Sequence, residues 1–129
     1  MLSIRRIARN RTRVISTALF LMALPLAASS QLLGLTWPGL TREDVEGMDS
    51  ASQKVLQEAS DHAVVQWENP DSNRAGVVRL VRSYEAHGMS CRVLDYTIRF
   101  EETGNQPDHY AVNWCRLPDG EWKIVELAG

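Results

Sequence analysis

The chain has 129 residues and a formal net charge of −2 at pH 7, but this charge is divided unevenly along it. Five of the 14 basic residues and none of the 16 acidic residues lie in the first thirty positions, so residues 31–129 carry a net charge of −7. An acidic stretch with no basic stripe repels phosphate backbones, which argues against nucleic acid as a partner, and its length fits a single domain.

The first thirty residues have the order of a secretory signal peptide. A segment with five arginines is followed by an apolar run over residues 14–28 and by small residues up to Ser30. This order predicts that residues 1–30 direct export and are cleaved before Gln31. The alternative is an uncleaved anchor, because the leucines after Gln31 extend the apolar span to about 20 residues, enough to cross a bilayer. Membrane association is expected only through such an uncleaved N-terminal segment.

A short apolar tether is predicted for residues 31–39, which end in Trp37-Pro38-Gly39. Thr41 is then suited to be a helix N-cap, because its hydroxyl can accept a hydrogen bond from an amide one turn on, with Asp44 as its capping-box partner. Apolar residues follow at helical spacing, at Val45, Met48, Ala51, Val55, Leu56 and Ala59. One amphipathic helix is therefore predicted from Arg42 to Ser60, with its apolar stripe packed against a sheet.

The hydrophobic period changes to two after this helix, which predicts strands separated by turn-forming residues. The predicted strands are Ala63–Trp67, Gly76–Tyr84, Ser90–Glu101, Asp108–Leu117 and Glu121–Leu127. The segments between them are rich in glycine, proline, asparagine and aspartate, which form turns. The sequence therefore predicts an α+β domain over residues 40–129, in which one N-terminal amphipathic helix packs on an antiparallel meander sheet of about five strands.

The chain has two cysteines, Cys91 and Cys115, and both lie in the part expected to be exported. An even pair in an oxidising compartment predicts a disulfide, whose Cα atoms must lie within about 7 Å of each other. Antiparallel strands joined near residue 103 place the two cysteines directly opposite each other, and a turn is predicted independently close to that position. A redox pair or a zinc site is the alternative, but both use cysteines at short spacings.

This register determines which side chains face one another across the strands. The opposed pairs are Leu94–Val112, Tyr96–Tyr110, Arg92–Trp114 and, across the last hairpin, Arg116–Trp122. Arg92, Trp114, Arg116 and Trp122 are therefore predicted to alternate on one face, where each guanidinium can stack on an indole. We treat these four residues as a candidate binding face for an envelope protein or a glycan. The alternative is that they pack within the core of a small domain.

Residue patterns typical of catalysis are absent from the sequence. The three histidines fall at a helix end, a turn and a strand start, and nothing in their spacing brings them together. There is no nucleophile elbow around a serine and no glycine-rich phosphate loop after a strand. The sequence therefore predicts a protein that is not an enzyme and that holds no cofactor and no metal.

The residues that mark the turns and the cysteines also resemble a known family. They are Trp67-Glu68-Asn69-Pro70-Asp71-Ser72, Gly76-Val77-Val78, Tyr84 before a glycine turn, Cys91-Arg92, Cys115-Arg116 and Asp119-Gly120-Glu121-Trp122-Lys123-Ile124. In this order they resemble the C-terminal domain of the rickettsial 17-kilodalton surface-antigen family, over Leu40 to Val125. The resemblance implies a bacterial outer-membrane or surface-associated antigen domain without enzymatic activity. Longer members look like lipoproteins with a glycine zipper, whereas this sequence has no lipid-accepting cysteine and no glycine-rich run.

Two functions are expected from these observations. The first is a non-catalytic, exported protein of the cell envelope, in the periplasm or associated with the outer membrane, with a structural or binding role. The second is a small periplasmic inhibitor or ligand-binding module that uses the arginine–tryptophan face. Neither function identifies the partner.

Overall fold

The computed structural model describes residues 31–58, 60–103 and 106–126. The segment predicted to be the signal peptide, residues 1–30, lies outside the described residues. In the described part, no helix is both long enough and apolar enough to span a membrane.

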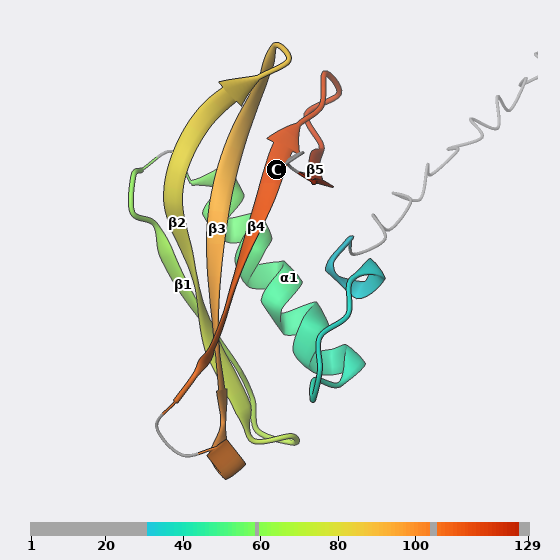
Figure 1. Ribbon diagram of the computed structural model, residues 1–129, viewed down its shortest axis with the longest axis vertical. Coiled ribbons are helices and arrows are strands. Elements are labelled where there is room, and N and C mark those ends of the chain that lie inside the picture. Colours follow the sequence, from blue (N-terminus) through green and yellow to red (C-terminus); the bar gives the residue numbers. More distant parts are fainter. Residues whose placement is uncertain (1–30, 59, 104–105, 127–129) are drawn as a thin grey trace, which may run out of the picture.

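One helix covers one face of a five-stranded antiparallel sheet (Figure 1). The helix α1 spans Arg42–Gln57, and the strands are β1 (Val64–Asn69), β2 (Arg74–Ala86), β3 (Met89–Phe100), β4 (Asp108–Arg116) and β5 (Trp122–Val125). Two short 3₁₀ helices, η1 (Gln31–Gly34) and η2 (Glu101–Thr103), complete the elements. The strands lie in the sheet in chain order, so the predicted α+β meander is confirmed.

The helix α1 begins as the capping pattern predicts. Thr41 Oγ1 accepts a hydrogen bond from the amide of Asp44 at 3.2 Å, and the Asp44 carboxylate accepts one from the amide of Thr41 at 2.9 Å. The helix ends at Gln57 with Glu58 as its C-cap, three residues before the predicted end at Ser60. The helical spacing of apolar residues therefore predicted the position of the helix. The helix ends before the predicted residue because Glu58 has an extended backbone.

The hydrophobic core lies between α1 and the inner face of the sheet, the face that α1 covers. It contains the apolar stripe of the helix together with Val78, Leu94, Ile98 and Trp114. The segment predicted to be a tether also contributes, because Leu32 and Trp37 are buried in this core. Trp37 donates a hydrogen bond from Nε1 to the carbonyl of Leu32 at 2.8 Å. Residues 31–39 are therefore packed on the domain rather than extended away from it.

The strand registers agree with those expected from the cysteines. Across β3 and β4 the opposed pairs are Cys91–Cys115, Arg92–Trp114, Leu94–Val112 and Tyr96–Tyr110. Across β4 and β5, Arg116 lies opposite Trp122. The two cysteines form a disulfide with a Cα–Cα distance of 4.0 Å. This short distance is typical of a cross-strand pair whose backbones do not hydrogen-bond to each other.

A β-bulge in β2 was not predicted. Leu80 pairs with Leu94 of β3, but Arg82 pairs with Val93, so that Val81 is the extra residue. Leu80 belongs to the buried core, whereas Tyr84 lies beyond the bulge and pairs with Cys91. One extra residue reverses the face on which every later side chain of the strand lies. The bulge therefore places Tyr84 on the face of the sheet opposite to that of Leu80.

A chain of hydrogen bonds crosses the core from the sheet to the helix. Trp114 Nε1 donates to the Tyr96 hydroxyl at 3.1 Å, Tyr96 lies 2.7 Å from Ser52 Oγ, and Ser52 donates to the carbonyl of Met48 at 2.8 Å. Since Ser52 uses its proton on Met48, Tyr96 donates to Ser52. Burial raises the pKa of Tyr96, so its hydroxyl keeps that proton. Trp114, Tyr96 and Ser52 thus each have a hydrogen-bond partner for their buried polar groups.

Candidate functional site

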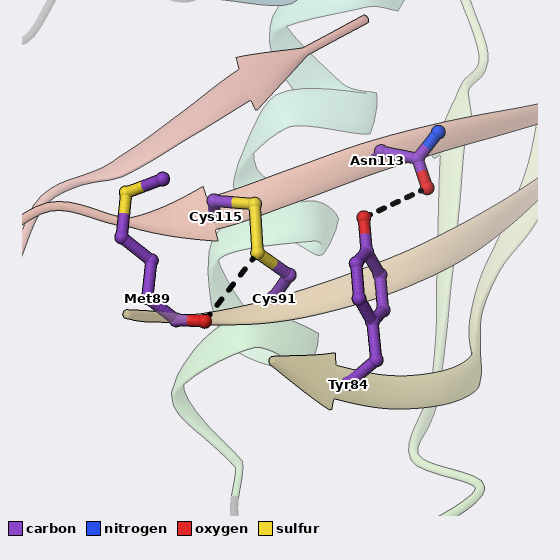
Figure 2. Close-up of a disulfide and its surroundings, with 5 residues drawn as sticks. All are labelled: Tyr84, Met89, Cys91, Asn113 and Cys115. Carbon is purple, nitrogen blue, oxygen red and sulfur yellow. Dashed lines mark hydrogen bonds between the residues drawn. A yellow bond between two sulfur atoms is a disulfide. The ribbon is translucent and has the colours of Figure 1, made fainter. Parts of the chain in front are cut away.

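The disulfide lies on the outer face of the sheet, the face that α1 does not cover. Cys91 and Cys115 are both almost fully buried. Figure 2 shows Tyr84 and Met89 beside the two sulfur atoms. The Tyr84 hydroxyl donates to Asn113 Oδ1 at 3.3 Å, and the Cys91 sulfur lies 3.7 Å from the carbonyl of Met89. The bridge is therefore sheltered from solvent, which is typical of a structural disulfide rather than a reactive one.

The four residues of the candidate binding face differ in how far they are buried. Trp114 is fully buried in the core, and Trp122 is half-buried against it. Arg92 is half-buried and places its guanidinium 5.2 Å from the centre of the Trp122 ring, whereas Arg116 is exposed. The predicted register is therefore present, but only Arg92, Arg116 and Trp122 reach the surface of the protein. Any ligand on this face would meet those three side chains.

Arg92 also caps the C-terminal end of α1, a role that the sequence did not indicate. Its Nη1 atom donates to the carbonyls of Val55, Leu56 and Glu58, at 3.3, 2.6 and 2.8 Å. The last carbonyls of a helix have no partner within the helix and form the negative end of its dipole. A cation from β3 thus satisfies them and connects the sheet to the end of α1.

The Arg92→Met variant is expected to lose about 2 kcal/mol of unfolding free energy, because the helix carbonyls lose a charged donor while the aliphatic packing remains. Urea denaturation measures this loss. Arg92→Lys should retain part of the stability, since an ammonium group can reach fewer of the three carbonyls. Hydrogen exchange should show the largest loss of protection at the C-terminal turn of α1. Equal stability of Arg92→Met and the natural protein would contradict the capping role.

Asp44 connects the start of α1 to the turn between β1 and β2. Besides closing the capping box, its Oδ1 atom accepts hydrogen bonds from Asn69 Nδ2 at 2.8 Å and from the Ser72 hydroxyl at 2.6 Å. Asp44 is fully buried. Burial acts to raise the pKa of its carboxyl, but the hydrogen bonds from Ser72, Thr41 and Asn69 outweigh it, so that the pKa lies below the usual value of 3.8.

The Asp44→Asn variant is expected to lose about 2 kcal/mol of unfolding free energy at pH 7, because a charged acceptor of three polar groups is replaced by a neutral one. A carboxyl with a lowered folded pKa contributes stability above its unfolded pKa, near 3.8, and loses this contribution as the pH falls through the lower folded value. The difference between the natural protein and Asp44→Asn should therefore shrink below pH 4. Urea denaturation at pH 7 and pH 2.5 measures both differences, and a difference independent of pH would contradict the role of the charge.

A hollow on the outer face of the sheet has charged walls. Its volume is about 400 Å³, and it lies where Ala75 has only a short side chain between the longer side chains of β1 and β3. Glu68 lines it from β1 and Arg99 from β3, each paired with Ala75 in the sheet. Among the described residues, no group of three or more histidine, cysteine, aspartate or glutamate side chains is placed to hold a metal ion.

Comparison with known proteins identifies the family. A family model described as the 17 kDa outer membrane surface antigen matches residues 54–123. The chain belongs to this family. The chain is 34% identical to the 17 kDa surface antigen of Rickettsia bellii over 88 residues, which cover 67% of this chain and 54% of that protein. It is 33% identical to the 17 kDa surface antigen of Rickettsia prowazekii over 84 residues, 64% of this chain and 51% of that protein.

The chain spans about half the length of the curated relatives that it matches. No solved structure matches it. The resemblance inferred from the turn and cysteine motifs is therefore confirmed by the surface-antigen family model, which runs from the last turn of α1 into β5.

The residues that carry this surface-antigen resemblance have structural roles in the fold. Asn69 and Ser72 donate hydrogen bonds to Asp44. Gly76 lies against the Trp67 ring, and the two cysteines link β3 to β4. In the last hairpin, Gly120 has a positive φ of 91°, a backbone conformation that favours glycine. These positions therefore contribute to the shape of the domain.

Proposed function

We propose that this protein is a non-catalytic, exported protein of the bacterial cell envelope, of the surface-antigen type, with a structural or binding role. The observation that carries the proposal is the buried Cys91–Cys115 bridge in a chain that belongs to a family of outer membrane surface antigens. Disulfides of this structural kind form and persist outside the reducing cytosol. The basic and apolar order of the first thirty residues supports export by a signal sequence.

The proposed location is the cell envelope, in the periplasm or in association with the outer membrane. Export with cleavage before Gln31 would release a soluble acidic domain, and retention of the apolar segment would anchor it to a membrane. The mass of the protein recovered from cells distinguishes the two forms.

Cell fractionation combined with thiol labelling tests this proposal. Protein expressed in a bacterial host should be recovered from the envelope fractions with both cysteines protected from alkylation until a reductant is added. Recovery from the cytosol at full length, with both thiols alkylated at once under denaturing conditions, would contradict it. The Cys91→Ala/Cys115→Ala variant is the control, since it should reach the same fraction without the reductant-dependent labelling.

A second candidate function is a binding module for an envelope protein or a glycan, and it is favoured by the exposed Arg116 beside the half-buried Trp122. The proposed contact surface consists of Arg92, Arg116 and Trp122. Because Arg92 also caps α1, its variants cannot separate binding from folding. Arg116→Ala should weaken crosslinking of the protein to an envelope component with unchanged urea stability, and Lys123→Ala, on the outer face of β5, should not. Equal crosslinking by Arg116→Ala and the natural protein would contradict this function.

A further inference from the structure

The two edges of the sheet differ in how their backbone groups are satisfied. At the β5 edge, the side chain of Gln31 takes the place of a neighbouring strand. Gln31 Nε2 donates to the carbonyl of Trp122 at 3.2 Å, and Gln31 Oε1 accepts from the amide of Ile124 at 2.7 Å. One side-chain amide thus pairs with two of the backbone groups that β5 directs away from β4, the carbonyl of Trp122 and the amide of Ile124, so that this edge is partly closed.

The β1 edge is open. The amide of Leu80 donates to the carbonyl of Ala63 at 2.9 Å, and opposed residues of an antiparallel ladder alternate between bonded and unbonded pairs. Continued along β1, this alternation directs the backbone N–H and C=O groups of Val64, Gln66 and Glu68 away from β2. In Figure 1, no other described strand or helix lies beyond β1 on that side.

β1 has few of the features that usually protect an edge strand. Of its six residues, Val64–Asn69, only Glu68 is charged and none is proline, and the bulge between β2 and β3 lies in β2. The side chain of Val64 is 48% exposed, which makes it one of the few large apolar side chains on the surface of the described part. An unprotected edge with exposed apolar side chains is a template for pairing with another strand.

The sequence of β1 is complementary to itself when two copies pair in antiparallel orientation around Gln66. Gln66 then lies opposite Gln66 of the second copy, and Val64 lies opposite Glu68, so that no two like charges face each other. The two Glu68 carboxylates are separated by four residues along the strands, about 13 Å. On the inner face, Val65 lies opposite Trp67. A shift that moves the axis towards Asn69 would place Glu68 closer to its own copy.

We propose that a second copy of this chain adds to the β1 edge, so that two five-stranded sheets form one continuous sheet across a two-fold axis at Gln66. The occupant is the chain itself because β1 can pair with a second β1 through two aromatic–β-branched pairs, Val65 with Trp67, without bringing like charges opposite each other, and because Gln31 already occupies part of the other edge. An isologous contact of this kind ends with two copies.

Analytical ultracentrifugation of the full chain, in the form recovered from cells, tests this proposal. The natural protein should show a concentration-dependent dimer. Gln66→Pro should raise the dimer dissociation constant by about tenfold or more, because it removes the two symmetric hydrogen bonds at the axis. Proline is tolerated where an edge-strand N–H faces solvent, so the circular dichroism of the monomer should not change. Gln66→Thr keeps the N–H and should dimerise like the natural protein.

A cysteine pair tests the register even where a proline variant fails to fold. Gln66→Cys should form an intermolecular disulfide on mild oxidation, because bonded antiparallel partners have Cα atoms about 5.5 Å apart. Glu68→Cys should not crosslink to itself, since the same register separates its two copies. A protein that stays monomeric at about 1 mM, a Gln66→Pro dimer of natural affinity, or crosslinking by both cysteine variants alike would each overturn the proposal. Pairing of β1 only with a different protein would appear as a monomer and would overturn it too.

Discussion

Replacing Gly76 by alanine is expected to lower the unfolding free energy by about 3 kcal/mol, the upper end of the usual range for overpacking. An added Cβ would collide with the carbonyl oxygen of Thr97 in β3 and would lie 2.7 Å from Nε1 of Trp67. The first of these atoms belongs to the backbone of a central strand, so it cannot move aside without disturbing the ladder. Urea denaturation measures the loss.

Gly34→Ala is the matched control, because an added Cβ at Gly34 would meet no atom within 4 Å. Its stability should lie within about 0.5 kcal/mol of the natural protein. Combining Gly76→Ala with Trp67→Phe separates the two contacts. The collision with Thr97 remains in this double variant, so Gly76→Ala should still be costly in the Trp67→Phe background. Natural stability of Gly76→Ala would show that the strands can shift to accommodate a methyl group.

Removing the disulfide in the Cys91→Ala/Cys115→Ala variant is expected to lower the unfolding free energy by about 3–4 kcal/mol. The bridge joins residues 24 positions apart, and the loss follows from the larger conformational entropy of the unfolded chain without that closed loop. For a domain of this size, such a loss is a large share of the total stability. Urea denaturation of both proteins without reductant measures it.

Reductant provides the control for the disulfide prediction. It should lower the midpoint of urea unfolding of the natural protein towards that of the double variant, and it should leave the double variant unchanged. Because both cysteines are almost fully buried, reduction of the folded protein should be slow and should require unfolding. Fast reduction under native conditions would show that the bridge is more accessible than its burial indicates.

Local patterns in the sequence determined most of the fold. The start of α1 follows from Thr41 and Asp44, which lie three residues apart, and the strands follow from alternation between turn-forming residues. The pairing of β3 with β4 also follows from the sequence, because two cysteines on neighbouring antiparallel strands admit one register that agrees with the turn near residue 103. Such features are predictable since each depends on neighbouring residues or on a single covalent constraint.

The candidate site was predicted only in part. The register of Arg92, Trp114, Arg116 and Trp122 could be derived, since it continues from the cysteine pair and the last hairpin. The burial of Trp114 and the contact of Arg92 with the carbonyls of α1 could not. Both depend on where the helix lies over the sheet, and no local pattern sets that position.

The sequence by itself thus determined the elements, the order of the strands and the disulfide. Only the tertiary structure decided how distant segments meet. Asp44 reaches a turn about 25 residues away, Gln31 hydrogen-bonds to β5 more than 90 residues later, and an extra residue at Val81 turns Tyr84 towards the disulfide. Polar contacts of this kind form because the folded backbone leaves particular donors and acceptors without partners, and that set is known only once all the elements are packed together.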